Sequence, residues 1–317
     1  FSLAGLNFPV AVSWLIIGVS GGAGIFYGRW LTGRKNFQSF PQLSRTEKGI
    51  LIGGVLFYLF LWALAYILPD SENDGLWYHN PTLHFWALKG RIHWITVDYE
   101  PFWNDLIDYS WNGYLKGVEA IGFLFLRAIP VGRFLNGINL IIIPLGCLGI
   151  AALTRFLGAS RRSAILGAVL FLLIPNVICH AANLYIGASV ASFYIALFAI
   201  TAFTIREMEN GRTPFPFIPA LGCALGLAVS AKGTAVVLFL LIPAILTLFW
   251  LRNLRRSRGR LVTFKTGIIF IMLTLMIACL VGGYWYLRNY LKTGTPLYPI
   301  GLEVGGATIF PDRKSTR

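Results

Sequence analysis

Runs of about twenty apolar residues recur along the 317-residue chain and constrain its fold more than any other feature. As an α-helix, each run is long enough to cross the roughly 30 Å of hydrocarbon in a membrane. Hydrophobic residues make up 56% of the chain and charged residues 13%, whereas an average soluble domain is about 25% charged. The alternating pattern of a membrane β-barrel is absent. The sequence therefore predicts an all-α polytopic membrane protein.

Basic residues gather between the apolar runs and indicate an orientation. Sixteen of the 27 lysines and arginines fall in four short connections, which the positive-inside rule assigns to the cytoplasmic side. The membrane topology thus accounts for the net charge of +14, and we expect no nucleic-acid partner. We expect about eight transmembrane helices in one domain over residues 1–317, in a chain that is part of a longer polypeptide. The predicted spans are 3–28, 49–68, 131–154, 163–178, 188–205, 215–231, 234–251 and 266–286.

The connection over residues 69–130 differs from the rest of the chain. Between Asp70 and Glu119 lie eight of the thirteen carboxylates, three of the four histidines and five of the ten tryptophans, but only three basic residues. The topology predicts a large outer loop here, where polar groups that hydrocarbon excludes can bind a ligand or carry chemistry. The stretch 115–129 is apolar on one side but short and charged, so we expect the loop to contain interfacial helices.

Within this loop, the run Asp74-Gly75-Leu76-Trp77-Tyr78-His79-Asn80-Pro81 is the strongest candidate for a site. It places a carboxylate and an imidazole close together at the membrane surface. Such a pair can deprotonate an acceptor hydroxyl or help to hold a cation. The alternative is that Asp74 caps a helix beginning near Leu76, with Tyr78 and His79 as interface anchors.

The run from Asp74 to Gly90 resembles the first outer-loop signature of the C-type superfamily of integral-membrane glycosyltransferases. The similarity is to the bacterial branch related to protein O-mannosyltransferases and lipid A aminoarabinose transferases. Three further stretches are similar to that family in the same order along the chain, so that the resemblance covers roughly residues 49–300. These stretches are Asn112 to Glu119, Leu225 to Gly233, and Trp285 to Pro299.

The resemblance implies an enzyme that transfers a sugar from a polyprenyl-phosphate carrier at the outer face of a bacterial-type inner membrane. Membrane lipid and lipid-linked sugar are then the expected partners. Asp74 takes the place of the family's catalytic base or metal-organising carboxylate, and inverting transfer also needs a cation for the departing phosphate. For Lys232 and Arg288 the plainer alternative is that they only end their spans. The expected substrate-binding residues are Tyr78, His79, Glu119, Lys232, Arg288 and Asn289.

One departure from the family pattern bears on a metal. Members often carry a second acidic residue at the outer turn between the fourth and fifth predicted spans, where this chain has Gly187. The sequence also contains no Asp-x-Asp and no HExxH pattern. We therefore assign no metal ligands and expect no certain cofactor, although a divalent cation stays open.

Three classes of function remain. The first is a glycosyltransferase, and the second is a catalytically inactive scaffold or accessory subunit of a larger membrane complex. The third is a transporter, which the sequence disfavours because the predicted spans contain almost no central ionisable residues.

Overall fold

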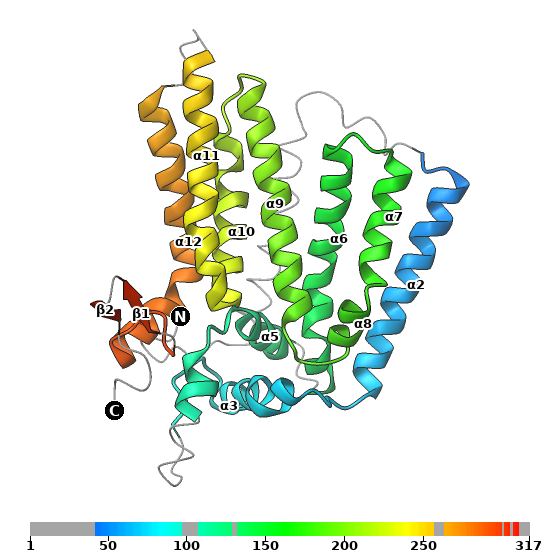
Figure 1. Ribbon diagram of the computed structural model, residues 1–317. Helices are drawn as coiled ribbons and strands as arrows, with labels where there is room; N and C mark the ends of the chain where they lie inside the picture. The colour runs from blue at the N-terminus through cyan, green and yellow to red at the C-terminus, as the bar shows by residue number, and fades with distance from the viewer. Residues whose placement is uncertain are drawn as a thin grey trace.

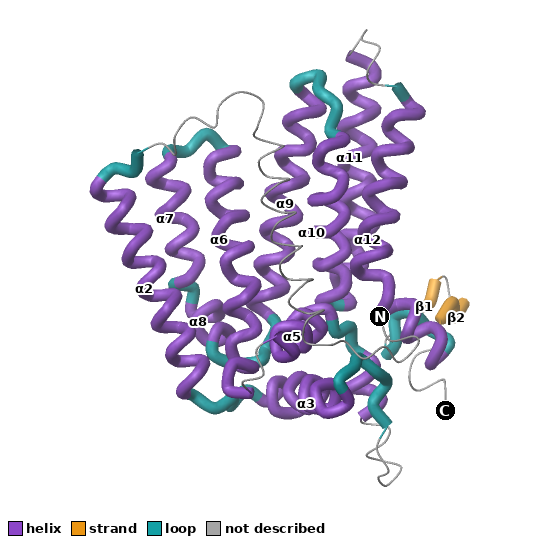
Figure 2. The backbone as a smooth tube through the Cα atoms, turned by 180° about the vertical axis from the view of Figure 1, so that it is seen from behind, coloured by secondary structure: helices purple, strands orange, loops and turns teal. Residues whose placement is uncertain are grey.

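The computed structural model describes residues 42–96, 107–128, 132–256, 263–299, 301–304 and 307–310, and most of them are helical. Long helices stand side by side, while two shorter helices lie across one end of the bundle (Figure 1). The upright helices are α2 (Arg45–Ile67), α6 (Ile138–Phe156), α7 (Arg161–Leu172), α9 (Gly187–Glu209), α10 (Ile218–Ala231), α11 (Val236–Arg256) and α12 (Phe264–Thr293). The helices across the end are α3 (Asn80–Lys89) and α5 (Gly117–Ala128), and the view from behind shows the same arrangement (Figure 2).

The helical membrane-type fold is confirmed, whereas the predicted count of eight spans is not. Five described helices are long and apolar enough to cross a membrane. They are α2, the segment Leu135–Phe156 that includes α6, α9, the segment Gly233–Leu254 that includes most of α11, and α12. The predicted span 163–178 consists of two helices, α7 and α8 (Pro175–Ala181), which together are long and apolar enough for a sixth span but are bent by 58° where Pro175 begins the second helix. The predicted span 215–231 is a shorter apolar helix, and the first predicted span lies outside the described residues.

Small residues bring α10 close to α12. A Cβ atom on Gly282 would meet the carbonyl oxygen of Gly226, and a Cβ on Gly222 would lie 2.7 Å from the Cβ of Ile277. Such close approach is a usual way to pack helices in membranes, where burial from water contributes little. The contact buries Leu221 and Leu225 completely. It thereby holds the end of α10, and with it Lys232, in one place.

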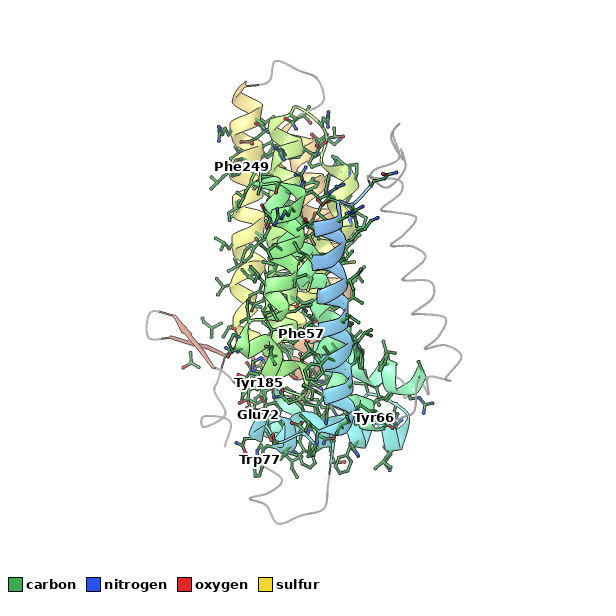
Figure 3. All side chains as sticks on the ribbon, turned by 90° about the vertical axis from the view of Figure 1, so that its right-hand side faces the viewer. Phe57, Tyr66, Glu72, Trp77, Tyr185 and Phe249 are labelled. Carbon is green, nitrogen blue, oxygen red and sulfur yellow. The ribbon has the colours of Figure 1, made fainter. Side chains whose placement is uncertain are left out.

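Charged groups divide between the two ends of the bundle. At the end opposite α3, Arg161 forms two hydrogen bonds with the Glu47 carboxylate, at 2.8 and 2.7 Å, and joins the first turns of α7 and α2. Figure 3 shows Phe249 toward that end, whereas Glu72, Trp77 and Tyr185 lie at the other. The acidic segment and the basic connections are thus separated along the bundle axis. The membrane side that each end faces remains a prediction.

A two-stranded antiparallel hairpin departs from the predicted all-α class. It pairs β1 (Leu302–Val304) with β2 (Ala307–Phe310), close to the end of α12 (Figure 1). Among the described residues this hairpin is the only sheet.

Candidate functional site

A cavity of about 540 Å³ lies at the end of the bundle where α3 and α5 cross it. Its wall comes from segments that are far apart in the sequence: the turn before α3, the start of α9, the break between α10 and α11, and the last part of α12. Four of the predicted site residues meet here, and they are Asp74, Tyr78, His79 and Lys232. Glu119, Arg288 and Asn289 do not line the cavity.

The Asp74 carboxylate faces the Tyr78 hydroxyl and caps no helix. Residues Gly75–His79 form a π-helical turn, a local irregularity that is frequent at functional sites. Asp74 precedes this turn without a side-chain capping bond, so the capping alternative is wrong. The Tyr78 hydroxyl donates a hydrogen bond to Asp74 Oδ2 at 3.0 Å. Burial first, and the Asp74 charge second, raise the pKa of Tyr78 above its usual range, so this hydroxyl stays a donor.

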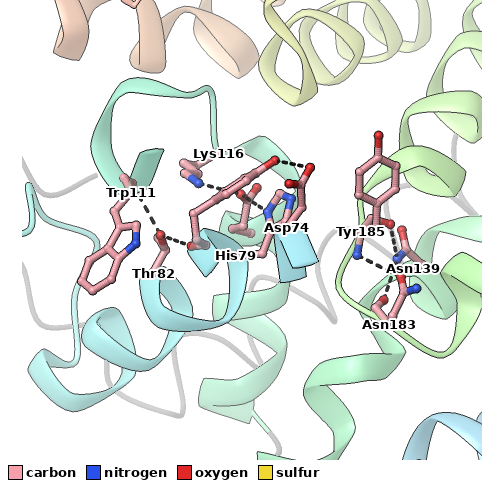
Figure 4. A network of polar contacts seen from close by, with 10 residues as sticks. Asp74, His79, Thr82, Trp111, Lys116, Asn139, Asn183 and Tyr185 are labelled. Carbon is pink, nitrogen blue, oxygen red and sulfur yellow. Dashed lines mark hydrogen bonds and ion pairs between the residues drawn. The ribbon is translucent and has the colours of Figure 1, made fainter. Parts of the chain in front are cut away.

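Behind the cavity wall, three ionisable side chains form a buried group that we call the Lys116–Glu119–His79 cluster (Figure 4). The Glu119 Oε1 atom lies 2.7 Å from His79 Nδ1 and 3.2 Å from Lys116 Nζ. The exposed fractions are 0% for Lys116 and 2% for the other two. Burial alone would raise the pKa of Glu119, but the charge of Lys116 and the contact with His79 outweigh it and lower the pKa to about 2. Glu119 is therefore ionised at neutral pH.

Lys116 itself was not predicted as a site residue. It is fully buried, and its Nζ atom lies 4.6 Å from the centre of the Tyr78 ring. Burial lowers the pKa of Lys116, although the Glu119 charge acts in the opposite direction. The available signal in the sequence was its spacing of three residues from Glu119 at the start of a helix. A lysine with a carboxylate partner on the next turn is usually an exposed pair, which is why the spacing alone does not indicate burial.

Arg288 and Asn289 tie the outer segment to α12. Arg288 Nη2 donates to the carbonyl oxygen of Asn112, and the guanidinium lies 4.9 Å from the centre of the Trp285 ring. Asn289 Nδ2 donates to the Gly113 carbonyl oxygen at 2.8 Å. These contacts hold the segment before α5, which includes Lys116, against the bundle. The structure thus gives both residues a positioning role beside the cavity.

Lys232 stands where α10 ends and the helical turn that leads into α11 begins. Its backbone is extended, with φ −151° and ψ 134°, and Gly233 and Thr234 line the cavity beside it. The side chain is exposed. The amino-terminal end of a helix carries a partial positive charge and unpaired N–H groups, which favour anions. This side of the cavity therefore suits a phosphate or carboxylate.

The opposite wall, at the turn before α9, is held by Asn139 (Figure 4). Its Nδ2 donates to the carbonyl oxygens of His180, Asn183 and Tyr185 at 2.7, 3.0 and 2.9 Å, and its Oδ1 accepts from Ser189 at 2.6 Å. Sequence reasoning missed this residue, because its partners lie more than forty residues away along the chain.

Gly187, the position where a second acid was expected, also lines the cavity. A Cβ atom there would lie 2.7 Å from His180 Cε1, so the imidazole occupies the space of any side chain at this position. Within the described ranges, no group of three or more histidine, cysteine, aspartate or glutamate residues is placed to hold a metal ion.

No family model, curated protein or solved structure matches the chain.

Proposed function

We propose that the protein is a membrane glycosyltransferase that uses a polyprenyl-phosphate sugar as its donor. The observation that carries this proposal is the lining of the cavity. Asp74 and Lys232 meet in one chamber whose remaining wall is largely apolar and aromatic. A lipid-linked sugar phosphate needs this combination: a surface for its chain, a cation for its phosphate, and a carboxylate beside its sugar.

In the proposed reaction, the acceptor hydroxyl loses its proton to the Asp74 carboxylate while its oxygen attacks the anomeric carbon of the sugar. The bond between that carbon and the phosphate oxygen breaks, and the electron pair leaves with the phosphate. Lys232 and the helix start beside it stabilise the developing negative charge. The hydrogen bond from Tyr78 occupies Asp74 Oδ2 and leaves the Oδ1 atom for the acceptor hydroxyl.

The proposal places the cavity on the outer side of a bacterial-type inner membrane. The basic connections that the positive-inside rule assigns to the cytoplasm lie at the opposite end of the bundle from the acidic segment. Support for this sidedness is the bidentate Arg161–Glu47 contact, which joins two of those basic connections at one end.

The test uses the whole chain in proteoliposomes with a panel of radiolabelled undecaprenyl-phosphate hexoses and pentoses, and a membrane extract as the source of acceptor. We expect Asp74→Asn to lower transfer by about 10²- to 10⁴-fold, the usual contribution of a general base. The control is Glu72→Gln, a carboxylate of the same loop that does not line the cavity. Full transfer by Asp74→Asn would remove Asp74 from the catalytic role.

A second candidate is a scaffold that kept the fold and lost the chemistry. The observation that favours it is His180, which fills the space at Gly187 where related enzymes often place an acid. Such a protein would co-purify with a defined membrane complex and bind no lipid-linked sugar. Absence of transfer by the wild type from every donor of the panel would favour this alternative.

A further inference from the structure

The Lys116–Glu119–His79 cluster has no part in the reaction above, although one of its members lines the cavity. His79 is 2% exposed, and its Nε2 atom is buried without a hydrogen-bond partner among the described residues. Buried polar atoms normally have a partner, so an atom without one, in a residue that lines a cavity, is a candidate for contact with a ligand.

Glu119 decides which ring nitrogen of His79 carries the proton. The ionised carboxylate accepts a hydrogen bond, so Nδ1 at 2.7 Å must be the donor. Lys116 already pairs with the Glu119 carboxylate at 3.2 Å, so this carboxylate has a cationic partner besides the imidazole. In a neutral imidazole one nitrogen donates and the other accepts. The Nε2 atom then offers a lone pair, and the shape of the ring directs it away from Glu119.

The other groups around the ring are compatible with this state. Asp74 lines the same cavity (Figure 4), and the Tyr78 ring packs on the imidazole with 4.2 Å between centroids. The nearby charges of Asp70 and Arg288 act on members of the cluster over longer distances. A lone pair beside a carboxylate repels an anion and attracts a hydroxyl.

We infer that Glu119 is a positioning residue that presents His79 Nε2 as the hydrogen-bond acceptor for a hydroxyl group of the bound ligand. The cavity then has two ends of different chemistry: a hydroxyl end at His79 and an anion end at Lys232. The identification of that hydroxyl as a sugar hydroxyl rests on the proposed function. The hydrogen bond itself rests only on the geometry of the cluster.

The test is ¹⁵N NMR of the whole chain, labelled at histidine and held in lipid nanodiscs treated with EDTA. The chain has four histidines. His79→Gln assigns the signals of His79, and His84→Gln is the matched control, because His84 is exposed on the same helical segment. We expect His79 to carry its proton on Nδ1 and none on Nε2 at neutral pH.

Two probes then separate the ends of the cavity. Octyl glucoside below its micelle concentration supplies hydroxyls without charge, and we expect it to shift the His79 Nε2 signal. Undecaprenyl phosphate supplies an anion, and we expect it to leave that signal in place. His79→Phe keeps a ring at this position but has no acceptor, and the loss of one hydrogen bond should weaken octyl glucoside binding by about tenfold.

The role of Glu119 is tested in the double variant Lys116→Met/Glu119→Gln, because Glu119→Gln alone leaves a buried lysine without its partner. We expect both ring tautomers of His79 to become populated there. A protonated Nε2 in the wild type, an Nε2 signal that ignores octyl glucoside, or an unchanged tautomer in the double variant would each overturn the inference.

Failure of this inference is distinguishable from failure of the proposed function. If the protein shows no transferase activity but octyl glucoside shifts the His79 Nε2 signal, the hydroxyl contact is supported and the proposed reaction is refuted. If the protein is an active transferase but octyl glucoside does not shift the His79 Nε2 signal, the proposed reaction is supported and the hydroxyl contact is refuted.

Discussion

The buried pair of Lys116 and Glu119 allows a sharp prediction about stability. At 3.2 Å and an effective dielectric constant near 20, the attraction between two unit charges is about 5 kcal/mol. Removal of one partner leaves the other charged and buried, and this costs roughly 3–5 kcal/mol. We therefore expect Glu119→Gln and Lys116→Met each to lower the free energy of unfolding by that amount.

The double variant should be much less damaging than the sum of the two single variants. Because both charges are removed, no unpaired charge stays buried. Replacement of a buried ion pair by neutral residues often changes the free energy of unfolding very little. We expect a loss of at most about 2 kcal/mol and a coupling energy of about 3 kcal/mol or more.

The assay is reversible unfolding in mixed micelles with increasing SDS, followed by tryptophan fluorescence. Trp86 and Trp285, stacked at 5.9 Å near the cavity, report on this region. The control cycle is Glu207→Gln with Arg212→Met, a pair at the other end whose arginine is exposed and whose glutamate is half-buried, and for which about 0–1 kcal/mol is expected. Additivity of the two cluster variants within about 0.5 kcal/mol would refute the reasoning.

Three further predictions follow from the same region. Glu119 binds a proton near pH 4.5 in the unfolded chain but only near pH 2 in the folded chain. The free energy of unfolding, measured by SDS titration, should therefore fall as the pH drops from 4.5 to 2. The fall should be smaller in the variant Lys116→Met/Glu119→Gln. Asn139→Leu should lower the unfolding free energy by about 2–4 kcal/mol, because three carbonyls lose their donor, whereas Thr201→Val, which breaks only a bond within α9, should cost under about 1 kcal/mol. Gly187→Asp should lower the thermal midpoint because of the contact with His180, and Gly187→Asp/His180→Ala should recover it; equal midpoints for the two variants would contradict this packing.

The sequence predicted much of the fold, because the features that decide it are local. A helix that crosses a membrane needs an apolar run of sufficient length, and such runs are visible without a structure. Two predicted spans, 163–178 and 215–231, do not form single long helices, and both contain proline. In the first, Pro175 starts a new helix at an angle; in the second, close packing of glycines against α12 encloses a shorter helix.

The candidate site was predicted in part. Asp74, Tyr78 and His79 were found because they lie in one six-residue stretch of the connection between two apolar runs, and Lys232 because it ends an apolar run. The roles of Arg288 and Asn289 could not be found in this way. Their partners, Asn112 and Gly113, are 176 residues away, and only the folded chain shows that they fasten the outer segment to α12.

The amino-acid sequence by itself determined that the chain is helical, suited to a membrane, and polar in one long connection, because hydrophobic length and charge are properties of consecutive residues. Tertiary structure alone decided which polar residues share a cavity and which are buried behind it. Lys116, His79 and Glu119 form one cluster only because the start of α5 packs against the turn before α3. A buried charge is stable only beside its partner, so the packing that brings the three together also keeps the Glu119 carboxylate ionised.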